Sequence, residues 1–160
     1  MVTTVADLRA VVADVPDPEV PVLTIDDLGV LRDVRVEPDG HVVVEITPTY
    51  SGCPAMDAIR DDVLTRLREQ GATGAEVRLV LSPAWTTDWM SEDGRRKLRE
   101  YGIAPPHLRG TGPVPLSLSV RCPRCGSPDT RETSRFGSTA CKSLWTCRAC
   151  LEPFDHFKAL

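Results

Sequence analysis

The sequence predicts an α+β protein built from two unequal parts. Over the first hundred residues, segments with helical and strand periodicity follow one another as helix, strand, strand, helix, strand and helix. A segment rich in proline and glycine then interrupts the pattern, and two Cys-x-x-Cys pairs follow near the C-terminus. We therefore expect a small three-stranded mixed sheet packed on helices over residues 1–101, a linker over 102–116, and a smaller β unit over 117–160.

The first helix is predicted over residues 4–14. Thr4 is a suitable N-cap, Asp7 lies in the first turn, and the apolar residues that follow recur at helical spacing. These apolar residues are Leu8, Val11, Val12 and Val15. The next segment, "PDPEVPVLTIDDLG", holds three prolines and four acidic residues, so we expect an irregular loop over residues 16–29.

A β-hairpin is predicted from "VLRDVRV" and "HVVVEIT", which flank the turn sequence "EPDG". Apolar residues alternate with polar ones in both segments, which indicates one face in contact with solvent. The alternating apolar residues are Val30, Val34, Val36, Val42, Val44 and Ile46.

The central helix is predicted in "CPAMDAIRDDVLTRLREQG", where Pro54 suits the first helical position and Gly71 suits the C-terminal cap. Its apolar stripe consists of Met56, Ile59, Val63 and Leu67. The segment "AEVRLVLS" then alternates through Val77, Leu79 and Leu81, which predicts a third strand that covers this helix. A right-handed β-α-β crossover would make this strand parallel to the one before the helix.

A last helix is predicted over residues 92–101, with Ser91 as its cap and Gly102 at its end. Trp85 and Trp89 precede it, and they could serve as interface anchors or as core residues.

The composition excludes several classes of protein. No run of eighteen apolar residues could cross a bilayer, and the N-terminus does not resemble a secretion signal, so we expect a cytoplasmic protein without a membrane partner. Residues 1–116 carry 12 basic and 19 acidic side chains, whereas residues 117–160 carry 7 and 4. Because the basic excess near the C-terminus is small and scattered, no nucleic-acid partner is expected.

The two cysteine pairs have the spacing CPRC-x21-CRAC, which is typical of two metal-binding knuckles that share one ion. The predicted ligands are Cys122, Cys125, Cys147 and Cys150. A segment with so few large apolar residues needs the ion in order to fold, so the ion is expected to be structural. Iron would give a centre of rubredoxin type, but "CRACL" lacks the glycine that follows both rubredoxin knuckles, which favours zinc and a β zinc ribbon.

Two cysteines remain outside this quartet. Cys141 lies six residues before Cys147, about 20 Å away along an extended strand, and is either a small buried residue or a working thiol. Cys53 precedes Pro54 at the start of the central helix, where free N–H groups and the helix dipole would lower its pKa. No motif links a histidine to Cys53. Asp17 and Glu19 are candidates to bind a metal or orient the thiol, although an acidic turn around Pro18 is the commoner reason for such a triplet.

The combination resembles a known family. "DPEVPVLTIDDLGVLRDVRV", "VEITPTYSGCPAM" and "VRLVLSPAWTTDWMSEDGRRKLREYGIAPP" resemble the domain of SufT and other iron-sulfur assembly factors. "CPRCGS" and "FGSTACKSLWTCRACLEPFDHFK" resemble the zinc-ribbon extension of the phenylacetyl-CoA epoxidase component called PaaD or PaaJ. The family's thiol matches Cys53, and its acidic triplet matches residues 17–19.

The resemblance implies an accessory role in aerobic phenylacetate degradation, where a multicomponent diiron monooxygenase epoxidises phenylacetyl-CoA. The chain has no Glu-x-x-His pairs and no Gly-rich dinucleotide motif, so no oxygenase or reductase activity of its own is expected. In one interpretation, Cys53, with Cys141 or a partner's thiol, handles a transient iron-sulfur cluster or iron for the diiron oxygenase or the iron-sulfur flavin reductase. In the other, the chain is a non-catalytic interaction module that stabilises a multisubunit complex. The sequence leaves the oligomeric state open, a dimer included.

Overall fold

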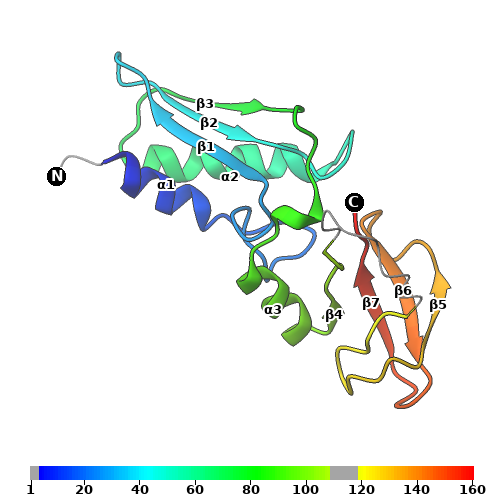
Figure 1. Ribbon diagram of the computed structural model, residues 1–160. Coiled ribbons are helices and arrows are strands. Elements are labelled where there is room, and N and C mark those ends of the chain that lie inside the picture. The colour runs from blue at the N-terminus through cyan, green and yellow to red at the C-terminus, as the bar shows by residue number, and fades with distance from the viewer. Residues whose placement is uncertain (1–3, 109–118) are drawn as a thin grey trace. The chain divides into compact units, whose positions relative to one another are not determined.

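The computed structural model describes residues 4–108 and 119–160, and the contacts among them divide the chain into two units (Figure 1). Unit 1 runs from Met1 to Ser91, and unit 2 runs from Glu92 to Leu160. Each unit contains one sheet. The α+β class expected from the sequence is therefore confirmed.

Unit 1 begins with helix α1 (Val5–Ala13), which has the predicted cap. The Thr4 hydroxyl accepts a hydrogen bond from the Asp7 N–H, and the Asp7 carboxylate accepts one from the Thr4 N–H at 2.9 Å. Leu8 and Val12 are the buried residues of this helix. The loop that follows is held by a β-bridge between Pro16 and Thr24. It buries four apolar side chains almost completely: Val20, Leu23, Ile25 and Leu28.

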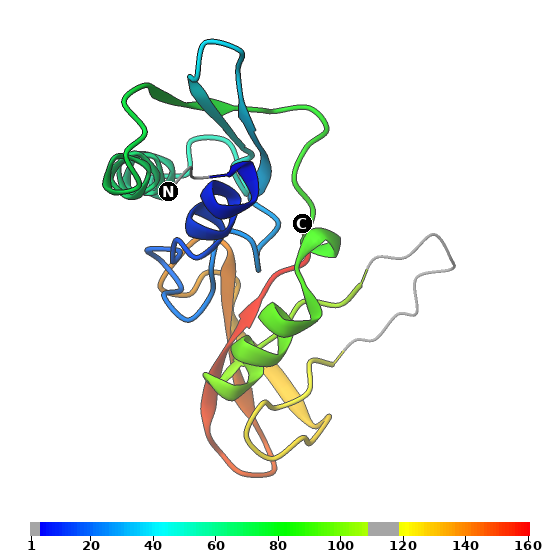
Figure 2. The ribbon, with the colours of Figure 1, turned by 90° about the vertical axis from the view of Figure 1, so that its left-hand side faces the viewer.

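The sheet of unit 1 has the order β1-β2-β3. Strands β1 (Leu31–Val36) and β2 (Val42–Ile46) form the predicted antiparallel hairpin, and β3 (Ala75–Leu79) pairs with β2 in parallel, also as predicted. Figures 1 and 2 show helices α1 and α2 on the same side of this sheet. Helix α2 (Ala55–Glu69) buries the whole predicted stripe, and Gly71 follows it with φ of +84°.

Two details of this sheet differ from the predicted alternation. Val43 lies by register on the face that carries Arg35 and Glu45, yet it is fully buried, so this face is not uniformly in contact with solvent. Leu79 and Leu81 are 44% and 69% exposed, so the third strand covers the helix less completely than its pattern suggests. Val43 is buried because β2 lies between β1 and β3, whereas Leu79 is exposed because β3 has a neighbouring strand on one side only.

The segment after β3 packs back onto the loop that precedes β1. Trp85 is buried and donates from Nε1 to the Leu28 carbonyl at 2.9 Å. The 3-10 helix η1 (Thr87–Trp89) follows, and the Arg32 guanidinium lies 4.0 Å from the centre of the Trp89 ring. Of the two interpretations of these tryptophans, the structure supports packing within unit 1.

Unit 2 contains helix α3 (Glu92–Glu100) and a sheet of order β4-β7-β6-β5. Its strands are β4 (Ile103–Ala104), β5 (Thr130–Ser134), β6 (Lys142–Cys147) and β7 (Pro153–Phe157). The small core is formed by Ala104, Val120, Trp145 and Phe154 around two of the cysteines.

Unit 1 ends at Ser91, ten residues before the end of the first domain predicted from the composition, residue 101. Helix α3 belongs with unit 2, since Arg95 donates to the Pro106 carbonyl at 2.5 Å and the short strand β4 pairs with β7. Part of the predicted linker is thus a strand, and its residues 109–116 lie outside the described residues. Within the described parts of the chain, no helix has the length and apolar character needed to span a membrane.

Candidate functional site

Cys53 lies in the turn that joins β2 to α2. Its N–H donates to the Tyr50 carbonyl at 3.3 Å, and its carbonyl accepts from the Met56 N–H at 3.3 Å. Pro54 occupies the cap position of α2 without a capping side chain, and the Ala55 N–H donates to the Cys53 thiol instead. The sulfur therefore sits at the N-terminal end of the helix, where the sequence predicts it.

The pKa of the Cys53 thiol is raised, and the predicted lowering is wrong. Burial is the largest cause, because the residue is only 8% exposed and a thiolate there would lose most of its hydration. The Ala55 N–H and the side chains of Thr49 and Tyr50 act in the opposite direction, but they do not offset the burial. The thiol is therefore protonated at neutral pH in the absence of a cation.

Glu19 is the acidic residue that acts on this thiol. It is half-buried, and its negative charge adds to the rise in the pKa of Cys53. Asp17 has a different position: it is buried, and its Oδ1 accepts from the N–H groups of Glu19 at 2.9 Å and Val20 at 2.7 Å. Asp17 thus shapes the loop that carries Glu19, while Glu19 is the residue brought near the cysteine.

Two threonines that precede Cys53 in the chain were not singled out from the sequence. The Thr49 hydroxyl lies 4.0 Å from the Cys53 sulfur, at the limit of a hydrogen bond to sulfur. Thr47, at the end of β2, is 1% exposed, and its hydroxyl has no hydrogen-bond partner among the described residues. The available signal was their spacing, four and six residues before the cysteine in "TPTYSGC".

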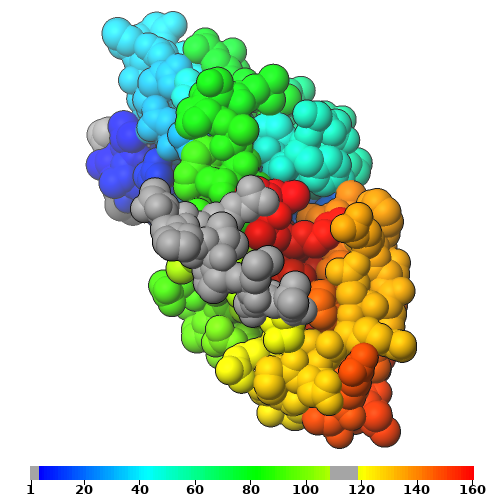
Figure 3. Space-filling view, turned by 45° about the vertical axis from the view of Figure 1, so that its right-hand side comes forward, coloured from blue at the N-terminus to red at the C-terminus, as the bar shows by residue number. Residues whose placement is uncertain are grey.

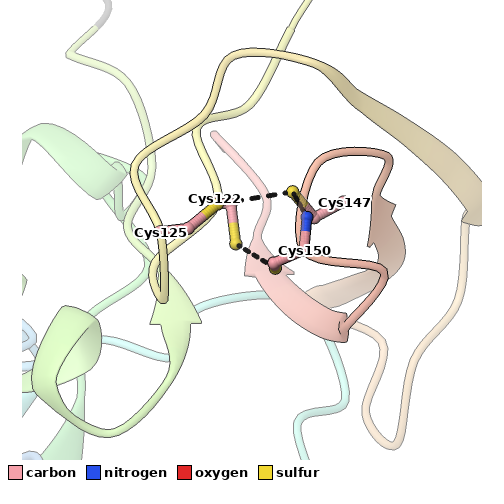
Figure 4. Close-up of side chains that lie close together, drawn as sticks. All are labelled: Cys122, Cys125, Cys147 and Cys150. Carbon is pink, nitrogen blue, oxygen red and sulfur yellow. Dashed lines mark hydrogen bonds between the residues drawn. The ribbon is translucent and has the colours of Figure 1, made fainter.

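The second cluster is the cysteine quartet of unit 2 (Figure 4). The sulfur of Cys122 lies 3.8 Å from that of Cys150, and the sulfur of Cys125 lies 3.6 Å from that of Cys147. All four sulfurs lie within 4.8 Å of one another. A tetrahedral zinc ion with Zn–S bonds of about 2.3 Å requires sulfur–sulfur distances of about 3.8 Å, so the four thiols fit zinc.

Two turns hold these sulfurs in place. In the first, the Gly126 N–H donates to the Cys122 carbonyl at 2.9 Å, and Gly126 has φ of +75°. In the second, between β6 and β7, the Cys150 N–H donates to the Cys147 sulfur at 3.4 Å. This N–H is the largest of several causes that lower the pKa of Cys147 to about 7, which favours the thiolate that a metal ion binds.

Cys141 is not part of this quartet. It lies just before β6, is 4% exposed, and its sulfur is 3.0 Å from the Thr139 hydroxyl. It belongs to unit 2, whereas Cys53 belongs to unit 1. Its burial matches the first of the two interpretations given above, that of a small buried residue.

Comparison with known proteins decides the relationship. Residues 6–79 match the family model described as iron-sulfur cluster assembly protein, and residues 111–158 match the PaaD zinc beta ribbon domain. A protein of Escherichia coli K12, provisionally named as the D subunit of 1,2-phenylacetyl-CoA epoxidase, is 49% identical over 98% of this chain and 93% of its own length. The chain belongs to the PaaD family. Its cysteine quartet is accordingly the zinc site of the family's ribbon.

Shorter relatives of this PaaD family member match only part of the chain. An Fe-S protein maturation auxiliary factor of Porphyromonas gingivalis is 38% identical over 58% of this chain and 88% of its own length. A crystal structure of a domain of unknown function, DUF59, from Bacillus anthracis covers 59% of this chain and 90% of its own, with a TM-score of 0.55 and 30% identity. These matches confirm the resemblance and the fold expected from the sequence.

Proposed function

We propose that the protein is an accessory factor of a 1,2-phenylacetyl-CoA epoxidase system, in which Cys53 receives iron or an iron-sulfur cluster and passes it to a client protein. The cargo is a substrate here and not a resident cofactor. The observation that carries the proposal is the placement of one thiol at the N-terminal end of a helix with the Glu19 carboxylate near it. The relatives named as Fe-S maturation factors support the same role.

The raised pKa of Cys53 suits a thiol that binds only when its cargo arrives. Burial and the charge of Glu19 both disfavour an isolated thiolate, but a cation bound to the sulfur offsets both effects. The thiol then loses one proton to solvent as the sulfur–iron bond forms. A single protein thiolate holds iron less strongly than a client with several ligands, which allows the cargo to leave.

In this role the zinc ribbon would act as a folded docking surface and not as a catalytic metal site. Four cysteines complete the coordination of the ion, so no position is open for a water molecule or a substrate. The ion stabilises the small core of unit 2, and we propose that unit 2 docks the oxygenase or the reductase.

The test is Cys53→Ser, with Cys141→Ser as the matched control because Cys141 is also a single buried thiol outside the quartet. Each variant is co-expressed with the epoxidase subunits, and the iron content and activity of the purified reductase and oxygenase are measured. We expect Cys53→Ser to lower both quantities severalfold and Cys141→Ser to leave them unchanged. If clients made with Cys53→Ser hold their full complement of iron, the transfer role is wrong.

A second function, an interaction module without transfer chemistry, is favoured by large apolar side chains on the surface of unit 2. Phe136 and Leu151 are 69% and 76% exposed. This alternative predicts that Cys53→Ala has no effect, whereas Cys147→Ser prevents assembly of the complex. The iron content of clients co-expressed with Cys53→Ala distinguishes the two functions: it falls if Cys53 transfers iron, and it is unchanged if unit 2 only holds the complex together.

A further inference from the structure

Strand β3 is an outer strand of the sheet in unit 1, and within residues 4–108 and 119–160 no strand pairs with its outer side (Figure 1). In Figure 3 the green segment around residue 80, close to β3, reaches the surface. The strand contains no proline, and Leu79 at its end is 44% exposed. An open edge of this kind can accept a further strand.

Two hydrogen bonds determine which backbone groups face this edge. The Val42 N–H donates to the Gly74 carbonyl at 2.9 Å, and the Val80 N–H donates to the Ile46 carbonyl at 2.8 Å. Gly74 and Val80 therefore direct their backbone groups towards β2, and every second residue between them does the same. It follows that Ala75, Val77 and Leu79 direct their N–H and C=O groups outwards.

We propose that β3 pairs antiparallel with β3 of a second copy of this chain, centred on Val77. In that register Val77 lies opposite Val77 of the second copy, and Ala75 lies opposite Leu79, so a small side chain faces a large exposed one. All of these residues direct their backbone groups outwards, so they form hydrogen-bonded pairs and the seam contains six backbone hydrogen bonds.

The charges of the strand match in the same register. Glu76 lies opposite Arg78 of the second copy at both ends of the seam, in positions that do not form backbone hydrogen bonds and where side chains approach most closely. Both side chains are accessible, 40% and 52% exposed, and they already form an ion pair within one chain. In the dimer, four alternating charges would lie along the seam.

The same charges exclude the neighbouring registers. Sliding the second strand by two residues places Glu76 opposite Glu76 in one direction and Arg78 opposite Arg78 in the other, and like charges directly opposite are unfavourable. A slide by one residue moves each apolar side chain to the polar face. The sequence "AEVRL" thus specifies one antiparallel register with itself.

The partner is therefore a second copy of the chain, and the association is weak. A seam of five residues is small beside the roughly 1,200–2,000 Å² that stable complexes bury, so we expect a dimer that dissociates on dilution. This inference does not depend on the role of Cys53.

The test is sedimentation velocity of the full, zinc-loaded chain over a range of concentrations. The wild-type protein should pass from monomer to dimer as its concentration rises. Arg78→Glu places carboxylates opposite carboxylates at both ends of the seam, and Glu76→Arg does the same with guanidinium groups, so each should lower the association constant about tenfold or more. Arg9→Glu, an exposed charge reversal on α1, is the control and should leave association unchanged.

Two further samples make the test specific. The double variant Glu76→Arg with Arg78→Glu has its charges exchanged but still complementary, so it should dimerise like the wild type. A mixture of the two single variants should form a heterodimer, although each variant alone associates more weakly than the wild type. A wild-type chain that stays monomeric at every concentration overturns the proposal, as does a dimer that both single charge reversals leave intact.

Discussion

Replacing Gly29 by alanine adds one methyl group and should lower the free energy of unfolding substantially. The residue has φ of +72°, and a Cβ there would lie 2.6 Å from the Trp89 Cβ and 2.7 Å from the Trp89 carbonyl oxygen. A non-glycine residue in this conformation costs about 1–2 kcal/mol, and overpacking against backbone adds about 1–3 kcal/mol. Gly29→Ala should therefore lower the free energy of unfolding by about 2–5 kcal/mol.

Gly40→Ala is the matched control, because Gly40 has φ of +85° but no heavy atom within 4 Å of the added Cβ. It should lose only the conformational part, about 1–2 kcal/mol. Urea unfolding followed by the far-UV circular dichroism of α1 and α2 gives both values. If the two variants differ by less than about 0.5 kcal/mol, the close approach of the loop to Trp89 is not present in the protein.

Three further predictions concern the thiols and the ribbon. Cys147→Ser, or an excess of chelator, should remove the one zinc ion and unfold unit 2, which elemental analysis and circular dichroism would detect; a unit 2 that unfolds cooperatively without metal contradicts this. Burial, and then the charges of His107 and Lys158, lower the pKa of His156 to about 4 from 6.5. Above pH 6.5 the imidazole of His156 is neutral in both the folded and the unfolded chain, so it costs the folded chain no stability. Between pH 6.5 and 4 only the unfolded chain binds the proton, so the free energy of unfolding should drop by about 2 kcal/mol between pH 7 and pH 5. His156→Phe should lose this part of the dependence and keep any part that comes from zinc release, whereas parallel curves for the two proteins would refute the assignment. Glu19→Gln removes a charge that raises the pKa of Cys53, so the thiol should be alkylated faster at pH 8, as measured by mass spectrometry of the Cys53 peptide; an unchanged rate means that the carboxylate does not act on the sulfur.

The local elements could be predicted because their signals lie close together along the chain. The capping box of Thr4 and Asp7 marks the start of α1, and the stripe from Met56 to Leu67 is the buried face of α2. The two Cys-x-x-Cys pairs identify the metal ligands, since a knuckle of this spacing brings both of its sulfurs to one side of a turn. The position of Cys53 beside the first turn of α2 follows in the same way.

The protonation of Cys53 could not be predicted from the same residues. The helix end favours a thiolate, but burial beneath the surrounding loops and the charge of Glu19, thirty-four residues earlier, reverse the direction of the shift. The burial of Val43, the exposure of Leu79 and the pairing of β4 with β7 likewise depend on neighbours from distant parts of the chain.

The sequence by itself determined which segments form helices and strands and which cysteines bind zinc, because periodicity, capping and ligand spacing act within a few residues. Only the tertiary structure decided how acidic the Cys53 thiol is, which acidic residue acts on it, and which strand edge stays open. Solvation and charge depend on the atoms that surround a group, and the fold draws those atoms from segments that the local pattern does not connect.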